Sequence, residues 1–359
     1  MTKIIITGGA GFIGSNLTRF IIKNYDFQIL NLDALKYSGN MSSLNTVKNN
    51  FKYSFVKGSI VNKKLVSKIF FDFKPNIIIN CAAETHVDRS IDNSFPFIET
   101  NILGTHVLLE CSLNYFNSLS KINKKNFLFH QVSTDEVYGD LKKNDLPSTE
   151  ESAYFPSSPY SASKASSDHL VMAWHRTYGL PVTISKCSNN YGPFQFPEKF
   201  IPHIIISALS NKKIPIYGDG KQTRDWIYVE DHIRAIIKII KKKEPGKTYN
   251  IGASNQISNY SLALKICNIL DQLVKTNKKK INKFKDLIYF VADRPGHDRR
   301  YAINSFLIEK KLGWKKKENF ESGLKKTVFW YLENQNWWKN ILIKKYSLKR
   351  LGILKKKGN

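Results

Sequence analysis

Short apolar runs alternate with helix-length segments through the first half of the chain. These runs, which we predict to be buried strands, lie at residues 3–7, 27–33, 51–56, 76–81, 127–132 and 180–187. Strands that alternate with helices are typical of right-handed βαβ units around a parallel sheet. We therefore predict an α/β fold with a doubly wound parallel sheet and a smaller, mixed α/β C-terminal domain.

The regular alternation stops after the sixth run, where glycine and proline become frequent. We assign residues 1–187 to the first domain, to which 222–255 return, and residues 188–221 and 256–335 to the second. Residues 336–359 are a basic tail without a strong pattern, which we expect to be peripheral. A Lys/Asn-rich loop within the first domain, at 114–126, has no assigned role.

Composition narrows the class of protein. The 359 residues include 56 Lys and Arg against 29 Asp and Glu, a net charge of +27. Most of the excess is lysine in short runs with few interleaved aromatics, which indicates solvated surface and makes nucleic-acid binding unlikely. The four cysteines form no C-x-x-C pair, and no apolar run is long enough to span a membrane. We expect a soluble, cytoplasmic protein without a metal site.

A glycine-rich loop follows the first predicted strand. Gly8, Gly11 and Gly14 precede a helix expected over residues 15–23. Glycines let backbone approach a pyrophosphate, and the free amides of a helix N-terminus bind it. Asp33 ends the second strand about 20 residues later, where it can accept both ribose hydroxyls and would repel a 2′-phosphate. The loop predicts a Rossmann dinucleotide site that prefers NAD to NADP.

A tyrosine and a lysine lie one helical turn apart. Tyr160 and Lys164 open a run free of glycine and proline that ends at Gly179, with Ser158 as the expected N-cap and Pro159 at the first helical position. Their spacing puts both side chains on one helix face. The lysine ammonium, with a nicotinamide cation nearby, would lower the pKa of the phenol enough for it to act as a base.

Two adjacent carboxylates, Asp135 and Glu136, follow the fifth predicted strand together with Thr134. In isolation such a cluster is most often a polar turn that caps a helix. At the mouth of a parallel sheet that binds a dinucleotide, it can instead supply acid and base chemistry. Repulsion between neighbouring carboxylates can keep one protonated while the other is ionised.

Together these motifs resemble the extended short-chain dehydrogenase/reductase family, and four further strings resemble its nucleotide-sugar 4,6-dehydratases. The strings are Ser188–Pro193, Phe196–Pro202, Arg224–His232 and Asp293–Tyr301, and the resemblance covers about residues 2–335. It implies a hydro-lyase that uses NAD to convert a nucleoside-diphosphate glucose, dTDP-glucose or UDP-glucose, to the 4-keto-6-deoxy sugar. This is an early step of deoxysugar biosynthesis of the rhamnose type. It also implies a homodimer formed through a helix pair that includes residues 160–178.

The resemblance also implies residue roles. Tyr160, with Lys164 beside it, would take the proton of the sugar C4 hydroxyl while Thr134 bonds the same oxygen. Glu136 would then remove the C5 proton, and Asp135 would protonate the departing C6 hydroxyl. The residues expected to bind NAD are Gly8, Gly11, Phe12, Ile13, Gly14, Asp33, Ser59, Ile60, Ala82, Ala83, Thr100 and Asn190. Those expected around the nucleotide sugar are Thr85, Asn189, Glu198, Lys199, Phe200, Tyr217, Arg224, Asn259, Arg294, His297 and Tyr301.

The chain departs from the family pattern at two cofactor positions. Ser59 stands where the family usually has an aspartate near the adenine, and Ala34 replaces a usual lysine. The first change could weaken or reshape the adenine contact without abolishing NAD binding. Neither position touches the proposed chemistry.

Other functions fit parts of the pattern. A 4-epimerase or a decarboxylase of the same family shares the glycine loop and the Tyr160–Lys164 pair, but an epimerase abstracts no C5 proton and has no use for Asp135 and Glu136. A non-catalytic NAD sensor or nucleic-acid-binding protein is favoured only by the charge. The sequence does not choose between dTDP-glucose and UDP-glucose, because thymine and uracil differ by one methyl group.

Overall fold

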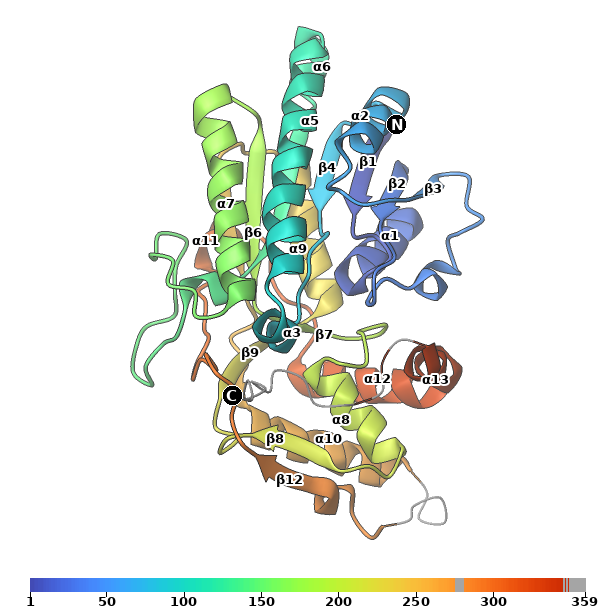
Figure 1. Ribbon diagram of the computed structural model, residues 1–359, viewed down its shortest axis with the longest axis vertical. Coiled ribbons are helices and arrows are strands. Elements are labelled where there is room, and N and C mark those ends of the chain that lie inside the picture. The colour runs from blue at the N-terminus through green and yellow to red at the C-terminus, as the bar shows by residue number, and fades with distance from the viewer. Residues whose placement is uncertain (275–280, 345, 347, 349–359) are drawn as a thin grey trace, which may run out of the picture.

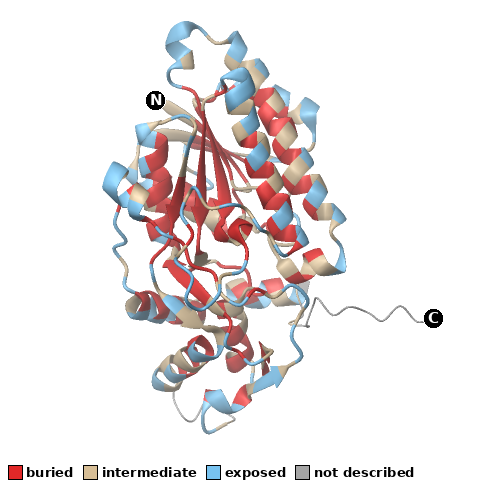
Figure 2. Cartoon of the chain, turned by 90° about the vertical axis from the view of Figure 1, so that its left-hand side faces the viewer, coloured by how far each residue is buried: buried red, intermediate tan, exposed pale blue. Residues whose placement is uncertain are grey.

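The computed structural model describes residues 1–274, 281–344, 346 and 348. Two lobes lie one above the other in Figure 1: a larger lobe built on a parallel sheet, and a smaller lobe of helices and short strands. In Figure 2 the strands of the large sheet are red, and therefore buried, between layers of helices. Within the described residues, no helix is both long enough and apolar enough to cross a membrane.

The large sheet has seven strands in the order β10-β6-β5-β4-β1-β2-β3, and every pairing is parallel. Its strands are β1 (Thr2–Thr7), β2 (Phe27–Asp33), β3 (Tyr53–Lys57), β4 (Ile77–Asn80), β5 (Leu128–Thr134), β6 (Val182–Cys187) and β10 (Lys247–Ile251). The order reverses between β1 and β4, which creates a ligand crevice at the carboxyl ends of the strands. The predicted doubly wound α/β fold is confirmed, and each of the predicted strands is present.

Helices cover both faces of this sheet because its strands are apolar on both sides. Ile4 and Ile6 pack with α1 and α9, whereas Ile5 packs on the opposite face with α2, α5 and α7. Helix α1 begins at Phe12, earlier than expected. The helices of this lobe are α1 (Phe12–Asn24), η1 (Met41–Leu44), α2 (Lys63–Phe73), α3 (Val87–Asp92), α4 (Phe95–Phe97), the π-helix η2 (Ile98–Leu103), α5 (Gly104–Ser118), α6 (Lys121–Lys124), η3 (Asp135–Tyr138), α7 (Pro159–Tyr178), α9 (Val229–Lys242) and α11 (Phe306–Leu312).

The smaller lobe has its own apolar core, to which Ile205, Trp226, Leu262 and Leu324 belong. A three-stranded sheet of order β11-β9-β7 and a two-stranded sheet of β12 and β8 accompany its helices. The elements are β7 (Asn189–Tyr191), α8 (Phe200–Leu209), β8 (Ile214–Tyr217), β9 (Thr223–Tyr228), β11 (Gln256–Ser258), α10 (Asn259–Leu273), η5 (Phe284–Leu287), β12 (Ile288–Val291), α12 (Phe320–Glu333) and α13 (Gln335–Lys344).

Residues 222–255, expected to return to the first domain, divide between the two lobes. Helix α9 packs on the large sheet and β10 joins its edge. Strand β9 instead pairs with β7 and β11, because the apolar face that carries Trp226 is buried in the core of the smaller lobe. The chain therefore crosses between the lobes within this segment.

Two segments differ from their predicted irregular structure. Part of the loop at 114–126 is helical, because α5 continues to Ser118 and α6 follows it. In the tail, residues 335–344 form α13, which is not peripheral: Trp338 and Ile341 are buried, and the Trp338 indole N–H donates to the carbonyl of Tyr331 at 2.9 Å. The rest of the predicted tail lies outside the described residues, except for Tyr346 and Leu348.

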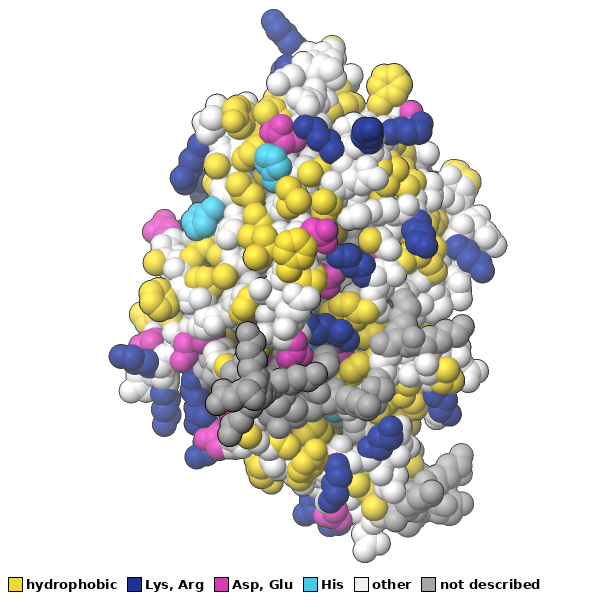
Figure 3. Space-filling model, in the orientation of Figure 1, with side chains coloured by type: hydrophobic (Ala, Val, Ile, Leu, Met, Phe, Trp, Pro, Cys, Tyr) yellow, Lys and Arg dark blue, Asp and Glu magenta, His cyan; other side chains and the backbone are white. Residues whose placement is uncertain are grey.

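Lysine and arginine side chains are scattered over the face shown in Figure 3, where they alternate with acidic, apolar and uncharged groups. On this face they form no continuous stripe. The distribution is what solvated charges on separate surface elements would give.

We predict that Gly14→Ala destabilises the fold. A Cβ at Gly14 would lie 2.3 Å from the carbonyl oxygen of Gly8, so the glycine loop would have to move, at a cost of about 2 kcal/mol or more. The control is Gly179→Ala. Gly179 has a φ of +68°, but no neighbouring atom lies within 4 Å of the added Cβ. We therefore expect this substitution to lower the free energy of unfolding by only about 1 kcal/mol. Thermal unfolding followed by circular dichroism should show the larger loss for Gly14→Ala, and equal losses would contradict the close approach.

Candidate active site

Two cavities adjoin where the lobes meet at the carboxyl ends of the large sheet. We call one, of about 260 Å³, the glycine-loop cavity, and the other, of about 220 Å³, the small-lobe cavity. The two cavities share Thr85, Glu136, Asn189 and Lys199 in their walls. A ligand in one cavity can therefore meet a ligand in the other at these side chains.

The predicted site residues gather around these two cavities. Those expected to bind the cofactor all line the glycine-loop cavity: Gly8, Gly11, Phe12, Ile13, Gly14, Asp33, Ser59, Ile60, Ala82, Ala83, Thr100 and Asn190. The predicted catalytic residues line it too: Thr134, Asp135, Glu136, Tyr160 and Lys164. Those expected around the nucleotide sugar all line the small-lobe cavity: Thr85, Asn189, Glu198, Lys199, Phe200, Tyr217, Arg224, Asn259, Arg294, His297 and Tyr301.

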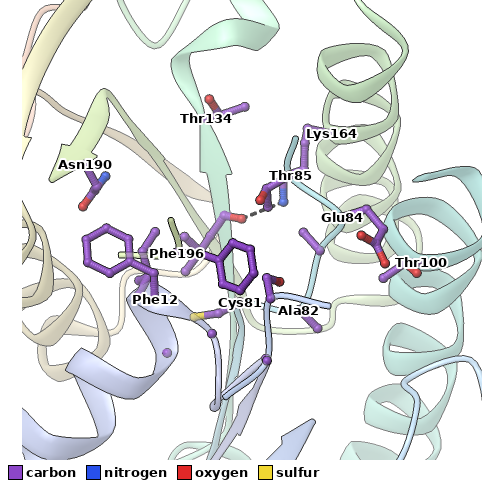
Figure 4. Close-up of a pocket in the computed structure, with 18 of the residues that line it drawn as sticks. Phe12, Cys81, Ala82, Glu84, Thr85, Thr100, Thr134, Lys164, Asn190 and Phe196 are labelled. Carbon is purple, nitrogen blue, oxygen red and sulfur yellow. Dashed lines mark hydrogen bonds between the residues drawn. The ribbon is translucent and has the colours of Figure 1, made fainter. Parts of the chain in front are cut away.

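The conformation of the glycine loop depends partly on the close approach of neighbouring backbone. Gly8 has a φ of +65°, and a Cβ there would lie 2.7 Å from the amide nitrogen of Ala82. Gly11 caps α1 without a side-chain hydrogen bond, and the first turn of α1 contains no acidic residue. The helix therefore presents free amide groups to the cavity. Figure 4 shows Phe12 at the start of this helix, beside the other labelled residues of the cavity. This arrangement fits a dinucleotide pyrophosphate.

Asp33 is held at the end of β2 by the loop that it faces. Its carboxylate accepts hydrogen bonds from the amides of Ala10 at 2.9 Å and Leu35 at 2.7 Å. Each carboxylate oxygen has a further lone pair, which suits the hydroxyls of a ribose. Ser59 also lines the cavity, so the position where the family usually has an aspartate carries no charge here.

The two carboxyl groups at the end of β5 have different surroundings. The hydroxyl of Thr134 accepts from the amide of Glu136 and lies 3.3 Å from Asp135 Oδ1, to which it donates. Burial, followed by the charge of Glu136, raises the pKa of Asp135 well above its usual range. Burial also raises the pKa of Glu136, but the positive charges of Arg224 and Arg294 oppose this rise. The protonated, neutral form is therefore favoured more strongly for Asp135 than for Glu136.

Helix α7 positions Tyr160 and Lys164. It begins with the predicted cap, in which Ser158 and Ser161 bond each other's backbone amides and Pro159 opens the helix. Both Tyr160 and Lys164 are buried on the face that meets β5. Lys164 Nζ donates to the carbonyl oxygen of a β5 residue, Val132, at 2.8 Å, the bond drawn in Figure 4.

The expected lowering of the Tyr160 pKa involves a nicotinamide cation as well as Lys164 and stays a prediction; the surroundings of Tyr160 within the chain act in the opposite direction. Burial, followed by the charge of Glu136, raises the pKa of Tyr160 well above its usual range. Burial also lowers the pKa of Lys164, although the charge of Asp168 opposes this. Sequence spacing reveals the shared helix face but gives neither the depth of burial nor the position of Glu136.

Three cations line the small-lobe cavity, and each is held by neighbouring groups. Arg224 lies 4.2 Å from the ring centre of Tyr301 and donates to the carbonyl oxygen of Asp298 at 2.9 Å. Lys199 Nζ donates to the carbonyl oxygen of Thr85 at 2.7 Å. The third cation is Arg294, which forms an ion pair with a carboxylate of the larger lobe.

That carboxylate belongs to Asp88, a site residue that the sequence did not reveal. It pairs with Arg294 and accepts a hydrogen bond from the hydroxyl of Tyr217 at 2.9 Å. Asp88 lies in the first turn of α3, but its partners lie far along the chain in the other lobe. Asp88 therefore orients two predicted substrate contacts at once.

Arg89, beside Glu198, and Tyr37, beside Arg89, are two further site residues that the sequence did not reveal. The buried carboxylate of Glu198 lies 3.0 Å from Arg89 Nε, and the guanidinium of Arg89 covers the ring of Tyr37 at 4.1 Å. Tyr37 belongs to the loop after β2, so this contact joins that loop, α3 and the smaller lobe. Among the described residues, no group of His, Cys, Asp and Glu could hold a metal ion.

Comparisons with known proteins agree with this geometry. The family model described as GDP-mannose 4,6 dehydratase matches residues 5–327. The chain is 50% identical over 360 residues to dTDP-glucose 4,6-dehydratase of Escherichia coli, which covers 98% of this chain and 99% of the relative. It is also 50% identical, over 98% of this chain and 99% of the relative, to dTDP-glucose 4,6-dehydratase of Neisseria meningitidis.

Solved structures give the same picture. The crystal structure of dTDP-glucose 4,6-dehydratase from Bacillus anthracis in complex with NAD has a TM-score of 0.83 and 42% identity, and the match covers 95% of this chain and 100% of that chain. UDP-glucose 4-epimerase of Thermotoga maritima has a TM-score of 0.80 and 29% identity, with 93% and 100% covered. Since the family model and the curated relatives match nearly the whole chain, the resemblance is confirmed and the chain belongs to the nucleotide-sugar dehydratases of the GDP-mannose 4,6 dehydratase family.

Proposed function

We propose that the chain is an NAD-dependent hydro-lyase that converts dTDP-glucose to the 4-keto-6-deoxy sugar, an early step of deoxysugar biosynthesis. The single observation that carries this proposal is the position of Asp135 and Glu136. The pair lines the glycine-loop cavity, and Glu136 also lines the small-lobe cavity. The relatives at about half identity favour dTDP-glucose over UDP-glucose as the substrate.

The glycine-loop cavity suits NAD along its length. The amides at the start of α1 would bind the pyrophosphate, and Asp33 would accept the ribose hydroxyls. The chemistry that NAD supplies when bound is reversible uptake of a hydride, taken from C4 of the sugar and returned to C6. A structural relative crystallised in complex with NAD supports this assignment.

Tyr160 and Thr134 would serve the oxidation at C4. The phenol of Tyr160 takes the proton of the C4 hydroxyl, and the hydroxyl of Thr134 bonds the same oxygen as it becomes a carbonyl. Because the chain itself raises the pKa of Tyr160, the positive charge that favours phenolate must include that of the nicotinamide ring as well as that of Lys164. Ionisation of Tyr160 is thereby tied to an occupied cofactor cavity.

Glu136 and Asp135 would serve the elimination. A C4 ketone makes the C5 proton acidic, and Glu136, in its ionised form, removes it. Asp135, which burial and the Glu136 charge keep protonated, gives its proton to the C6 oxygen so that water departs. The raised pKa of Asp135 is the property that an acid in this role needs.

The cations of the small-lobe cavity would bind the diphosphate of the substrate. Arg224 and Arg294 supply planar guanidinium groups, and Lys199 adds a third positive charge beside the shared wall. Their charges also lower the pKa of Glu136 and so favour its ionised form. Substrate binding and base strength are thus set by the same residues.

The 4-epimerase alternative shares the fold, as the TM-score of 0.80 shows. It gives no role to a buried, neutral Asp135 beside Glu136, and neither does an NAD sensor.

We also propose a homodimer through α5 and α7, which lie side by side in Figure 1. Along them Trp174 and His106 pack edge to face at 5.5 Å, Tyr178 is exposed on α7, and Leu103 is exposed at the end of η2, just before α5.

Turnover of dTDP-glucose in D2O is expected to give the 4-keto-6-deoxy product with deuterium at C5, without added NADH. NMR of the product measures this directly. UDP-glucose should be used less efficiently, by about tenfold in kcat/KM, because it lacks the thymine methyl. Epimerised sugar with an intact C6 hydroxyl, or stoichiometric release of NADH, would contradict the dehydratase proposal.

Glu136→Gln should stop elimination but leave oxidation at C4. We expect the rate of water loss to fall by about 10²- to 10⁴-fold, since a general base is removed, while NADH absorbance appears on the protein. Asp135→Asn should likewise slow elimination, because the amide cannot give up a proton to C6. Glu151→Gln, an exposed glutamate outside both cavities, is the matched control and should behave as wild type. Wild-type turnover in Glu136→Gln would remove this residue from its role.

The dependence of kcat on pH should be bell-shaped. Glu136 acts ionised, so kcat falls as the pH drops through its raised pKa; Asp135 acts protonated, so kcat falls again as the pH rises through its pKa. Arg224→Gln removes the charge that most lowers the pKa of Glu136, so the acidic limb should move to higher pH at saturating substrate. Arg299→Gln, which breaks an exposed pair with Asp219, should not move it. An unmoved limb in Arg224→Gln would refute this coupling.

A further inference from the structure

Two described residues that follow α13 reach the small-lobe cavity. Tyr346 and Leu348 both line the small-lobe cavity, together with His203, Phe200 and Trp226. These two residues lie beyond the motifs that identify the family, in the segment that the sequence describes only as a basic tail. Their position gives this segment a contact with the site that neither motif nor composition reveals.

The path to Tyr346 is anchored by α13. Trp338 and Ile341 are buried in the smaller lobe, and the indole of Trp338 is bonded to α12 through the carbonyl of Tyr331. The amide of Tyr346 then donates to the carbonyl of Ile341 at 3.2 Å. The backbone of Tyr346 is therefore fixed to the last turn of a packed helix.

The side chain of Tyr346 joins the walls of both cavities. Its hydroxyl lies 3.3 Å from Nδ1 of His203, which lines the small-lobe cavity. Its ring centre lies 6.2 Å from that of Phe196, which lines the glycine-loop cavity. Tyr346 thus lies between a wall residue of the small-lobe cavity and a wall residue of the glycine-loop cavity.

The surroundings of Tyr346, above all its burial, keep its hydroxyl neutral. Burial, followed by the charges of Glu198 and Tyr217, raises its pKa, while Arg89 opposes the rise. Burial lowers the pKa of His203 to about 4, so its imidazole is neutral as well. This part of the wall offers an aromatic ring and uncharged polar atoms, which suit the nucleoside or sugar of a ligand better than its diphosphate.

We propose that Tyr346 is a substrate-binding residue: its ring forms part of the nucleotide-sugar pocket, so that the C-terminal segment contributes directly to affinity for the substrate. The inference rests on the proposed function, because the ligand of the small-lobe cavity is taken to be a nucleoside-diphosphate glucose. A residue that only braced α8 would affect stability without changing affinity, and this difference makes the proposal testable.

The test compares full-length Tyr346→Ala and Tyr346→Phe with wild type, with dTDP-glucose as the probe. Loss of the ring should raise both the KM and the calorimetric Kd by about tenfold, while kcat and the bound NAD content stay within about twofold. Tyr346→Phe keeps the ring and should stay within about twofold in all four quantities. Ile343→Ala, which changes an exposed side chain in the last turn of α13, is the matched control and should match wild type.

An unchanged Kd in Tyr346→Ala would overturn the proposal, as would a lower kcat with unchanged KM. If Tyr346→Ala lowers the Tm, Tyr346→Leu, which keeps an apolar side chain without the aromatic ring, replaces it and must still weaken binding. Failure of the proposed function would appear separately, as absence of turnover by wild type with dTDP-glucose. In that event the Kd for dTDP-glucose still tests Tyr346, since it needs no reaction.

Discussion

Two adjacent carboxyl groups at the end of a central strand, Asp135 buried and Glu136 lining both cavities, impose the main constraint on this structure. Burial pushes Asp135 and Glu136 toward their neutral forms, and the charge of one makes ionisation of the other harder. The cations Arg224 and Arg294 act on Glu136 and so separate the two groups in acidity. In the proposed mechanism an acid and a base arise from adjacent residues because, of the two, only Glu136 lines the small-lobe cavity, where the three cations lie.

The contacts that build this junction cross from one lobe to the other. Asp88 of α3 holds Arg294 and Tyr217, and the carbonyl of Thr85 holds Lys199. The small-lobe cavity is therefore shaped by the larger lobe as well as by its own residues. Any movement between the lobes would change the placement of the cations and, through them, the ionisation of Glu136.

Local patterns predicted much of the site because much of it is local. The glycine loop, the acid at the end of β2 and the Tyr160–Lys164 turn each depend on a few consecutive residues and on the direction of one strand or helix. Asp88, Arg89 and Tyr346 depend on partners far away in the sequence, so periodicity could not reveal them. The same limit applies to Tyr160, because the burial and the Glu136 charge that raise its pKa come from other elements of the fold.

The fold itself leaves the reaction open, since a dehydratase and a 4-epimerase match it with TM-scores of 0.83 and 0.80. An epimerase of this family would use the same glycine loop and Tyr–Lys pair, since both reactions would begin by oxidising C4. An elimination requires two further proton transfers: removal of the C5 proton and protonation of the C6 oxygen. These transfers need one ionised and one protonated group within reach of the same sugar. In the proposed mechanism Glu136, in the wall shared by the two cavities, and Asp135, in the wall of the glycine-loop cavity beside it, meet this need, so two residues at a strand end decide the chemistry rather than the scaffold that carries them.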